Sequence, residues 1–200
     1  MSPADALLAS DRAEGVPGHP HQIVTRLSID VLESSPLPDP LRRQIRDLCT
    51  EAYREDFSNY LETLGAGVHV IGRLGDRIVS HAMWVTRALQ PEGRRPLRTA
   101  YVEAVATRPG HERHGFASQL LRCLAKEIRD YDLGGLSPSD DRFYARLGWE
   151  LWRGPLFVRT ETGLQATPNE SVMILRLRRT PVDLDLTAPL SAEWRPGELW

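Results

Sequence analysis

The chain has 200 residues, of which 41% are hydrophobic and 26% are charged, and its formal net charge is −2. This length fits one domain that buries roughly 70% of its unfolded surface, which is enough for a core without disulfide staples. The charge gives no sign of a nucleic-acid partner or of an anionic membrane surface as a partner. No apolar run reaches the roughly 18 residues of a membrane span, and the N-terminus lacks the basic flank of a signal peptide, so a cytoplasmic location is expected.

The cysteines and histidines give no sign of a disulfide framework or of a metal site. Cys49 and Cys123 each fall on the apolar side of an expected helix, which favours buried, reduced thiols. The six histidines show no pair at the spacing of metal ligands, so no metal is expected.

The chain begins with an arm and a strand–helix unit. Residues 1–21 are rich in Pro, Gly and His without periodicity, so we expect a flexible arm before a single domain over residues 22–200. The run at 23–29 predicts a strand, and the next helix is expected to start with Asp39 as N-cap and Pro40 in its first position. The apolar face of this helix is expected to comprise Leu41, Ile45, Leu48, Cys49 and Ala52.

Strand signals dominate the middle of the chain. A short helix over 54–65, closed by Gly65, is expected before two strands at 68–85 that meet at a Gly-Asp turn. A loop at 90–96 then leads to an apolar strand at 98–108. This order predicts neighbouring antiparallel strands.

Helices and strands alternate in the second half. A long amphipathic helix is expected from Gly115 to Tyr131, followed by a strand at 133–137 and a short helix that Gly148 closes. Further strands are expected at 149–152, 156–160 and 170–178. Hairpins followed by this alternation predict a mixed α/β fold with antiparallel and parallel strand pairs.

The junction between the strand at 98–108 and the long helix is a short basic loop, HERHGFA at 111–117. The first turn of a helix leaves backbone N–H groups unpaired, and together with the helix dipole they make an anion site. Gly115 lets the backbone approach a ligand, and Arg113 and His114 add positive charge. The loop therefore suits a phosphate or pyrophosphate, and the alternative is an ordinary turn with a surface histidine.

This loop resembles the pyrophosphate loop of the GCN5-related N-acetyltransferases, Q/R-x-x-G-x-G/A; Gly115 and Ala117 match it, and Glu112 departs from the usual Gln or Arg. The resemblance implies a mixed sheet of about six to seven strands flanked by about four helices, with a C-terminal strand and tail. It also implies acetyl-CoA as co-substrate, with its pantetheine arm along the strand VEAVAT. The implied cofactor-binding residues are Val105, Ala106, Thr107, Glu112, Arg113, His114, Gly115, Phe116, Ala117 and Ser118.

Five further segments resemble one subfamily, the aminoglycoside 2′-N-acetyltransferases. They are EDF at 55–57, YVEAVAT at 101–107, FYARLGW at 143–149, TPNE at 167–170 and WRPGELW at 194–200. The likeness runs from about residue 24 to residue 200, and the terminal motif is its most specific part.

The resemblance implies a role for each matching residue. Glu103 matches the general base that takes a proton from the substrate ammonium through water, and Tyr144 matches the proton donor to the leaving CoA thiolate. Ser137 matches a substrate-contacting serine. The acidic groups around the amines of a cationic aminoglycoside correspond to Asp56, Glu170, Glu198 and the carboxylate of Trp200.

Two departures from the subfamily concern the acceptor site. The segment after Asp56 is shortened, and Asn59 falls where a second substrate-binding aspartate is expected. The segment between Ser137 and Tyr144 is also shorter. A pocket with one fewer carboxylate suits an acceptor with fewer amines, for which kasugamycin is a candidate.

Each candidate residue also has a purely structural interpretation. Glu103 could face solvent at a bulge in its strand, and Tyr144 could pack in the core with its apolar neighbours. Ser137 and Asp56 could each be a residue that starts a helix. Glu170 could be a solvated charge in a loop, and Trp200 could be a frayed end.

The sequence supports three hypotheses about function. The first is an enzyme that acetylates the 2′-amine of an aminoglycoside and confers resistance, because acetylation removes a positive charge that the antibiotic uses against ribosomal RNA. The second keeps the chemistry but changes the acceptor to a polyamine, another amino sugar or a protein N-terminus. The third is a CoA-binding module without catalysis, supported only by Glu112. A homodimer is expected from the resemblance alone.

Overall fold

The computed structural model describes residues 26–34, 37–197 and 199–200. The expected arm over residues 1–21, the site residue Glu198 and the first three residues of the strand expected at 23–29 lie outside these ranges. None of the helices in the described part of the chain has the length and apolar character that a bilayer crossing requires.

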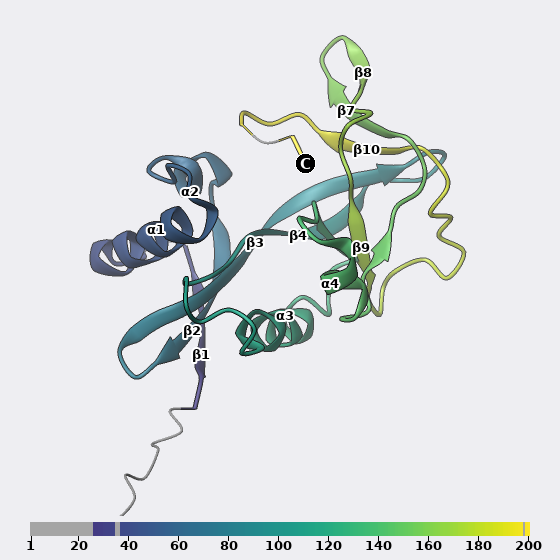
Figure 1. Cartoon of the computed structure of the whole chain (residues 1–200). Coiled ribbons are helices and arrows are strands. Elements are labelled where there is room, and N and C mark those ends of the chain that lie inside the picture. Colours follow the sequence, from purple (N-terminus) through teal and green to yellow (C-terminus); the bar gives the residue numbers. More distant parts are fainter. Residues whose placement is uncertain (1–25, 35–36, 198) are drawn as a thin grey trace, which may run out of the picture.

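The first half of the sheet is an antiparallel meander (Figure 1). β1 (Ser28–Glu33) pairs with β2 (Gly67–Leu74), which forms a hairpin with the long strand β3 (Arg77–Pro91). β3 then pairs along its length with β4 (Leu97–Thr107), and β4 pairs in parallel with β5 (Leu133–Leu136). The predicted hairpin and the apolar strand after it are therefore confirmed.

The remaining strands extend the sheet in both directions. β6 (Glu150–Leu151) and β9 (Met173–Arg176) continue beyond β5. Beyond β3, β10 (Leu190–Glu193) pairs in parallel with β7 (Leu156–Thr160), which pairs with β8 (Gly163–Ala166). The order β6-β9-β5-β4-β3-β10-β7-β8, with β2 paired to β3 and β1 paired to β2, makes a mixed ten-stranded sheet among the described residues.

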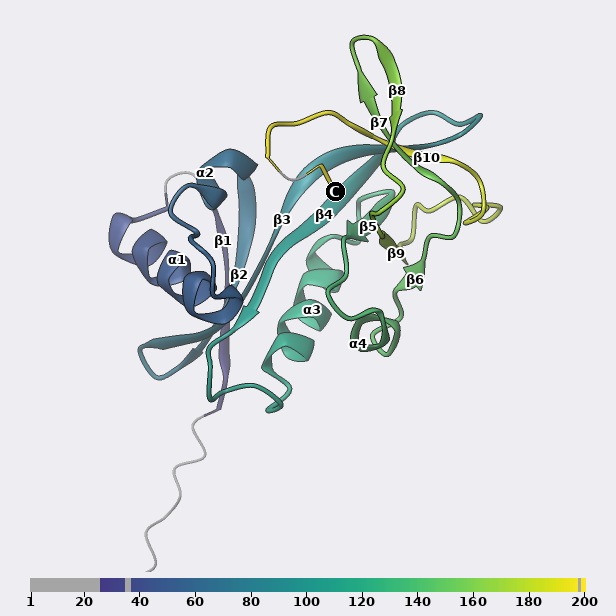
Figure 2. The same ribbon diagram turned by 45° about the horizontal axis from the view of Figure 1, so that its top comes forward.

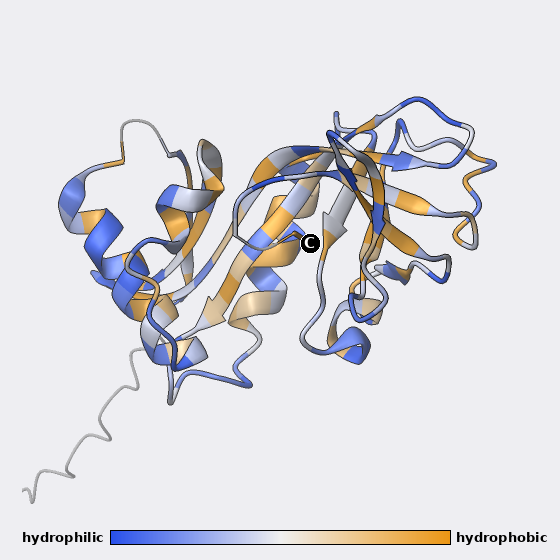
Figure 3. Cartoon of the chain, turned by 90° about the horizontal axis from the view of Figure 1, so that it is seen from above, coloured by the Kyte–Doolittle hydropathy of each residue, from blue (hydrophilic) through white to orange (hydrophobic). Residues whose placement is uncertain are grey.

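Helices cover both faces of this sheet and define two cores. α1 (Asp39–Tyr53) and α2 (Tyr60–Leu64) lie on one side of β2–β4, and α3 (Phe116–Glu127) and α4 (Asp141–Ala145) lie on the other (Figure 2). Hydrophobic residues follow the central strands and the inner sides of the helices (Figure 3). The buried face of α1 includes Ile45, Leu48 and Cys49, as predicted.

β4 and β5 pair over only a short stretch. Their pairing runs from Thr99 opposite Leu133 to Tyr101 opposite Gly135. Beyond Tyr101, none of the described strands pairs with β4 on this edge. The sheet opens there, and the second half of β4 has a strand partner on one side only.

A β-bulge interrupts β4 just past this opening. Ala104 and Val105 together oppose the single residue Ala82 of β3, and Ala104 takes a left-handed φ of +50°. The bulge inverts the alternation of side chains between the two faces of the sheet. Tyr101 packs on the α1 side before the bulge, whereas Ala104 and Ala106 pack there after it.

The starts of two helices differ from the sequence prediction. Pro38, and not Asp39, is the N-cap of α1, and no side chain caps this helix. Prolines at 38 and 40 remove backbone N–H groups from this end, so fewer groups need a cap. The N-cap of α4 is Asp140, whose carboxylate accepts two backbone amides of the first turn, so Ser137 does not start that helix.

The lengths of some elements also differ. β1 continues to Glu33, and the helix expected over 54–65 is reduced to α2, because the chain before it turns to bury Phe57. The helix expected to reach Tyr131 ends at Glu127. β8 and β10 were not predicted, since each has only four residues and lacks a clear alternating pattern.

Candidate active site

A cavity of about 230 Å³ lies where β4 parts from β5. Its walls come from the α1–α2 connection, the bulged part of β4, the β5–α4 connection and the C-terminal end. The lining side chains that bear chemistry include Glu55, Tyr60, Glu103, Ser137, Tyr144 and Trp200. The structure therefore gathers five of the predicted site residues around one space: Glu103, Val105, Ser137, Tyr144 and Trp200.

Glu103 is the buried carboxylate of this cavity, with 7% of its surface exposed. Tyr60 donates its hydroxyl to Oε2 at 3.1 Å, and Arg195 donates to Oε1 at 2.6 Å. Burial raises the pKa of Glu103 above its ordinary value, and the neighbouring Arg195 charge opposes that rise. The bulge expected for this strand is present, but Glu103 faces the cavity side of the sheet and not bulk solvent.

The C-terminal segment folds over this region, and its end lies beside the middle of β3 and β4 in two views (Figures 1 and 2). Arg87 of β3 donates to the carbonyl of Leu199 at 2.8 Å and to the side chain of Glu193 at 3.3 Å. The indole of Trp200 donates to Thr167 Oγ1 at 2.8 Å, and Trp200 is 3% exposed. Trp200 is thus docked in the site, which excludes the frayed-end interpretation.

An aromatic ring and two guanidinium groups pack together in the buried region next to Glu103. The guanidinium carbons of Arg87 and Arg195 lie 4.8 Å and 5.7 Å from the centroid of the Tyr101 ring. The Tyr101 hydroxyl is buried and has no hydrogen-bond partner in the described part of the chain. Burial is the main cause that raises the pKa of Tyr101, and the charges of Glu103 and Glu170 add to it. The Glu170 side chain itself is exposed and does not line the cavity.

Tyr144 on α4 is buried against an aromatic pair. Its ring meets Phe143 and Trp149 edge-on, at centroid distances of 5.0 Å and 6.3 Å. Burial raises the pKa of Tyr144 to about 12, so its hydroxyl is protonated at neutral pH. The side chain therefore packs in the core and also lines the cavity as a potential proton donor.

The basic loop forms the N-terminus of α3 with strained backbone and no side-chain cap. Arg113 and Gly115 have left-handed φ values of +63° and +76°, and Gly115 is the N-cap. A Cβ atom at Gly115 would meet nothing within 4 Å, so the space in front of this helix start is open. The Glu112 carboxylate accepts from the Gly110 amide at 2.6 Å and so turns back on its own loop. The arrangement suits an anion that takes the amides of the first turn.

The second half of β4 presents an edge suited to an extended ligand. Tyr53 donates its hydroxyl to the Val105 carbonyl at 2.8 Å, and Ser80 donates to the Ala106 carbonyl at 3.0 Å. Ser80 Oγ also lies 3.1 Å from Thr107 Oγ1. These contacts stabilise the segment that the sequence assigns to the pantetheine arm, while the edge toward β5 has no described strand partner.

Asp56 and Asn59 are, like Glu170, predicted substrate residues that do not line the cavity. Asp56 is exposed and accepts from the hydroxyl and from the amide of Ser58, at 2.5 Å and 2.9 Å, and these two hydrogen bonds lower the pKa of Asp56. Asn59 is exposed at the N-cap of α2. Neither residue lines the cavity, whereas the neighbouring Glu55 does. Asp56 thus forms a local turn with Ser58 and does not start a helix, because the N-cap of α2 is Asn59.

Sequence reasoning missed Tyr60, Arg195 and Glu55 as neighbours of Glu103 or of its cavity. Arg195 belongs to the terminal motif WRPGELW, so its position in that motif was the available signal. Tyr60 lies in a five-residue helix without any motif, and only the folded chain brings it to Glu103.

Comparison with known families assigns the chain. The profile described as "Acetyltransferase (GNAT) domain" matches residues 24–152, and the chain belongs to this family of acetyltransferases. It is an acetyl-CoA-dependent N-acetyltransferase. A relative in Mycolicibacterium fortuitum, named "Aminoglycoside 2′-N-acetyltransferase", is 32% identical over 178 residues, which cover 85% of this chain and 90% of the relative.

Solved structures share the fold at lower identity. A GNAT family N-acetyltransferase (YhbS) from Escherichia coli, solved in complex with CoA, aligns with a TM-score of 0.60 at 16% identity over 86% of this chain and 93% of its own. ElaA from Escherichia coli aligns with a TM-score of 0.55 at 15% identity, over 76% of this chain and 100% of its own. Eis1 from Mycobacterium abscessus aligns with a TM-score of 0.54 at 17% identity, over 66% of this chain, which spans only 33% of Eis1.

Proposed function

We propose that this acetyltransferase transfers acetyl from acetyl-CoA to the 2′-amine of an aminoglycoside and so confers resistance to it. The observation that carries the proposal is the buried Glu103, which lines the cavity together with Tyr144, Ser137 and Trp200. The likeness to the relative from Mycolicibacterium fortuitum over most of both chains supports the acceptor class. We extend the proposal, by resemblance alone, to a homodimer in the cytoplasm.

In this proposal Glu103 is the general base. A protonated amine cannot attack a thioester, so the ammonium must first lose a proton to a carboxylate or to a water that the carboxylate holds. Burial raises the pKa of Glu103, which makes it a better proton acceptor than an exposed carboxylate. Tyr60 and Arg195 hold its two oxygens and fix its direction.

Tyr144 acts at the other end of the reaction as proton donor. Its hydroxyl stays protonated at neutral pH because burial raises its pKa to about 12. Its ring is fixed between Phe143 and Trp149, so the hydroxyl can serve a leaving thiolate without a costly reorganisation. Acetyl-CoA supplies the activated acyl group.

The residues that we propose to bind acetyl-CoA lie in the basic loop before α3 and along the open edge of β4. We assign the pyrophosphate to the backbone amides from Arg113 to Ser118 and the pantetheine arm to Val105, Ala106 and Thr107. The uncapped start of α3 and the open edge of β4 support this assignment.

The acceptor is assigned to the acidic side of the cavity. Glu103, Ser137 and the Trp200 carboxylate are the proposed contacts, and Asp56, Asn59 and Glu170 would take part through a longer acceptor. A cavity of about 230 Å³ is below the range of roughly 300–1,000 Å³ for typical ligand sites. The small space favours a compact aminoglycoside such as kasugamycin.

The test is thiol release from acetyl-CoA by the purified protein. The acceptors are gentamicin, tobramycin and kasugamycin, with kanamycin A, which has a 2′-hydroxyl, as matched negative control, and spermidine as a non-sugar amine. Turnover on 2′-amines without turnover on kanamycin A is the expected result. Turnover on spermidine alone would assign the chain to another amine acceptor.

A further inference from the structure

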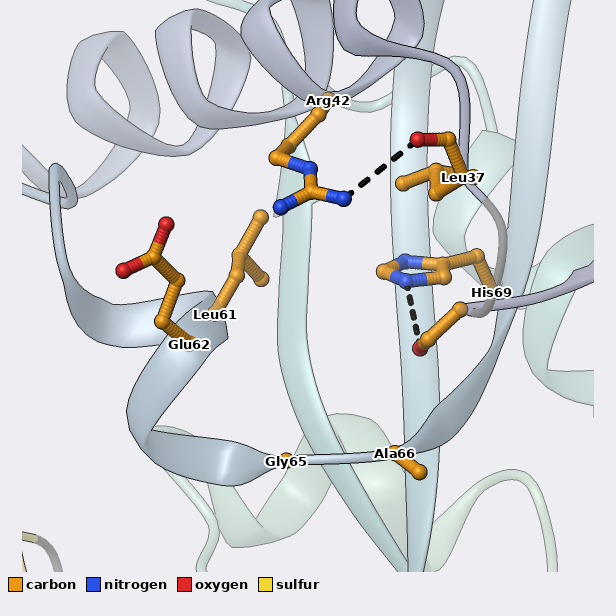
Figure 4. A pocket seen from close by; sticks show the side chains of 8 residues that line it. Leu37, Arg42, Leu61, Glu62, Gly65, Ala66 and His69 are labelled. Atoms are coloured by element: carbon orange, nitrogen blue, oxygen red, sulfur yellow. Dashed lines mark hydrogen bonds between the residues drawn. The ribbon is translucent and has the colours of Figure 1, made fainter.

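A chain of four hydrogen bonds runs beneath α1, outside the cavity. The Gly67 amide donates to Ser34 Oγ at 3.0 Å, and Ser34 Oγ lies 3.0 Å from His69 Nε2. His69 Nδ1 lies 2.9 Å from His81 Nε2, and His81 Nδ1 lies 2.9 Å from the carbonyl oxygen of Ala104. His69 forms part of the wall of a second cavity, where its contact to the serine hydroxyl is drawn (Figure 4).

The carbonyl oxygen of Ala104 is the last acceptor, and it determines which group donates and which accepts in every hydrogen bond of the chain. A carbonyl oxygen can only accept, so His81 must carry its proton on Nδ1 and accept on Nε2. His69 must then donate from Nδ1 and accept on Nε2, and the Ser34 hydroxyl must donate to it. Ser34 remains free to accept from the Gly67 amide, and every bond in the chain is satisfied by this one assignment.

Both imidazoles are neutral in the folded protein. Burial lowers the pKa of His69 to about 4 and that of His81 to about 3. A second proton on either ring would remove the acceptor that the chain requires. Cys49 Sγ lies 4.0 Å from His81 Nδ1, a long sulfur contact beside the 2.9 Å bond to Ala104, and it is a side branch of the chain.

The chain ends at the bulge in β4. The residue inserted at a bulge lacks a ladder partner, and Ala104 also carries the left-handed φ of +50° that a side chain disfavours. The Ala104 carbonyl accepts from the side chain of His81 on the neighbouring strand β3. The residue directly before this strained position is Glu103.

We propose that His81, supported by His69 and Ser34, is a positioning residue that holds the bulge and thereby aims the Glu103 carboxylate into the cavity. This inference rests on the proposed role of Glu103 as base. It assigns a function to two buried histidines that touch neither the cavity nor the cofactor loop.

The test compares His81→Leu with His81→Asn. The side-chain amide of asparagine can still donate to the Ala104 carbonyl in place of Nδ1, whereas leucine cannot donate. We expect the leucine variant to lose about 10- to 100-fold in kcat with the KM for acetyl-CoA unchanged, and the asparagine variant to recover most of that loss. Equal kcat values for the two variants would overturn the proposal.

A double-mutant comparison shows whether His81 acts through the carboxylate. In a Glu103→Gln background, His81→Leu is expected to change kcat by no more than about twofold, because there is no base left to position. The same loss in both backgrounds would overturn the proposal. A Glu103→Gln variant as fast as the parent would instead show that Glu103 is not the base. This outcome differs from one in which only the proposed role of His81 is wrong.

Nitrogen NMR of the intact protein with labelled histidine needs no variant. We expect His69 and His81 as neutral Nδ1–H tautomers between about pH 6 and pH 8, and an Nε2–H tautomer at His81 would overturn the assignment. Cys49→Ala is the matched control, because it removes a buried neighbour of His81 that the chain does not use. Its kcat is expected to stay within about twofold of the parent.

Discussion

Arg195 donates to Glu103 Oε1 at 2.6 Å, across 92 residues of sequence, and the two side chains are only 14% and 7% exposed. A cation from the C-terminal segment therefore rests on the carboxylate that we propose as the base. The positive charge of Arg195 partly neutralises the carboxylate, so it weakens the attraction between Glu103 and a cationic acceptor. It also sets the proton affinity of Glu103, because the arginine opposes the effect of burial.

Replacing Arg195 by Gln is expected to move the acidic limb of the pH profile toward higher pH. Burial alone would then act on Glu103, so its pKa would rise further, and a base must be deprotonated to work. The loss in kcat/KM should be largest at acidic pH and should shrink as the pH rises. An unchanged acidic limb would contradict this, and Arg195→Lys, which keeps the charge, should stay close to the parent.

Replacing Glu103 by Gln is expected to lower kcat/KM by about 10²- to 10⁴-fold at neutral pH. The amide oxygen can still accept from Arg195, so the fold around it should be kept. The deficit should narrow at alkaline pH, because the amine then loses its proton to solvent without help. A deficit that is constant with pH would show that Glu103 does not act as the base; kcat/KM measured across the pH range decides this.

Replacing Tyr144 by Phe is expected to lower kcat about 10- to 100-fold while the Kd for acetyl-CoA stays within about twofold. The phenyl ring keeps the contacts with Phe143 and Trp149, and only the hydroxyl is lost. Isothermal titration with CoA and steady-state rates separate the two effects. Unchanged kcat would mean that Tyr144 serves packing alone.

Replacing Arg87 by Ala is expected to destabilise the whole chain by about 2–4 kcal/mol. Arg87 is 3% exposed, and its loss leaves the Leu199 and Glu193 carbonyls without their donor. The melting temperature, followed by circular dichroism, measures the effect. Arg94→Ala is the control, because its ion pair with Asp183 is exposed and its loss should leave the melting temperature unchanged.

Local patterns in the sequence were sufficient for much of the fold. The Gly-Asp turn and the alternating runs beside it located the hairpin of β2 and β3, and the apolar stripe of α1 predicted which residues it buries. Gly115 located the start of α3. Each of these signals lies within a few residues, where periodicity and turn chemistry determine the structure.

The pairings between distant segments could not be predicted in the same way. Neither the contact of Arg195 with Glu103 nor the addition of β10 to β3 leaves a local signature, because each depends on how the whole sheet closes. The bulge in β4 is an example of this limit on predicting contacts between distant segments. A charge within an apolar strand pointed to an irregularity, but it did not reveal that His81 completes it from the neighbouring strand.

The contacts of Arg87 also bear on the order in which the fold is completed. This buried guanidinium on a central strand finds its partners in Glu193 and Leu199, which are 106 and 112 residues further along the chain. Contacts between such distant residues form late, because the entropy of closing a long loop must be offset first. We therefore expect the wall of the cavity that contains Trp200 to be completed late in folding, so that the acceptor site and the final stability of the protein appear together.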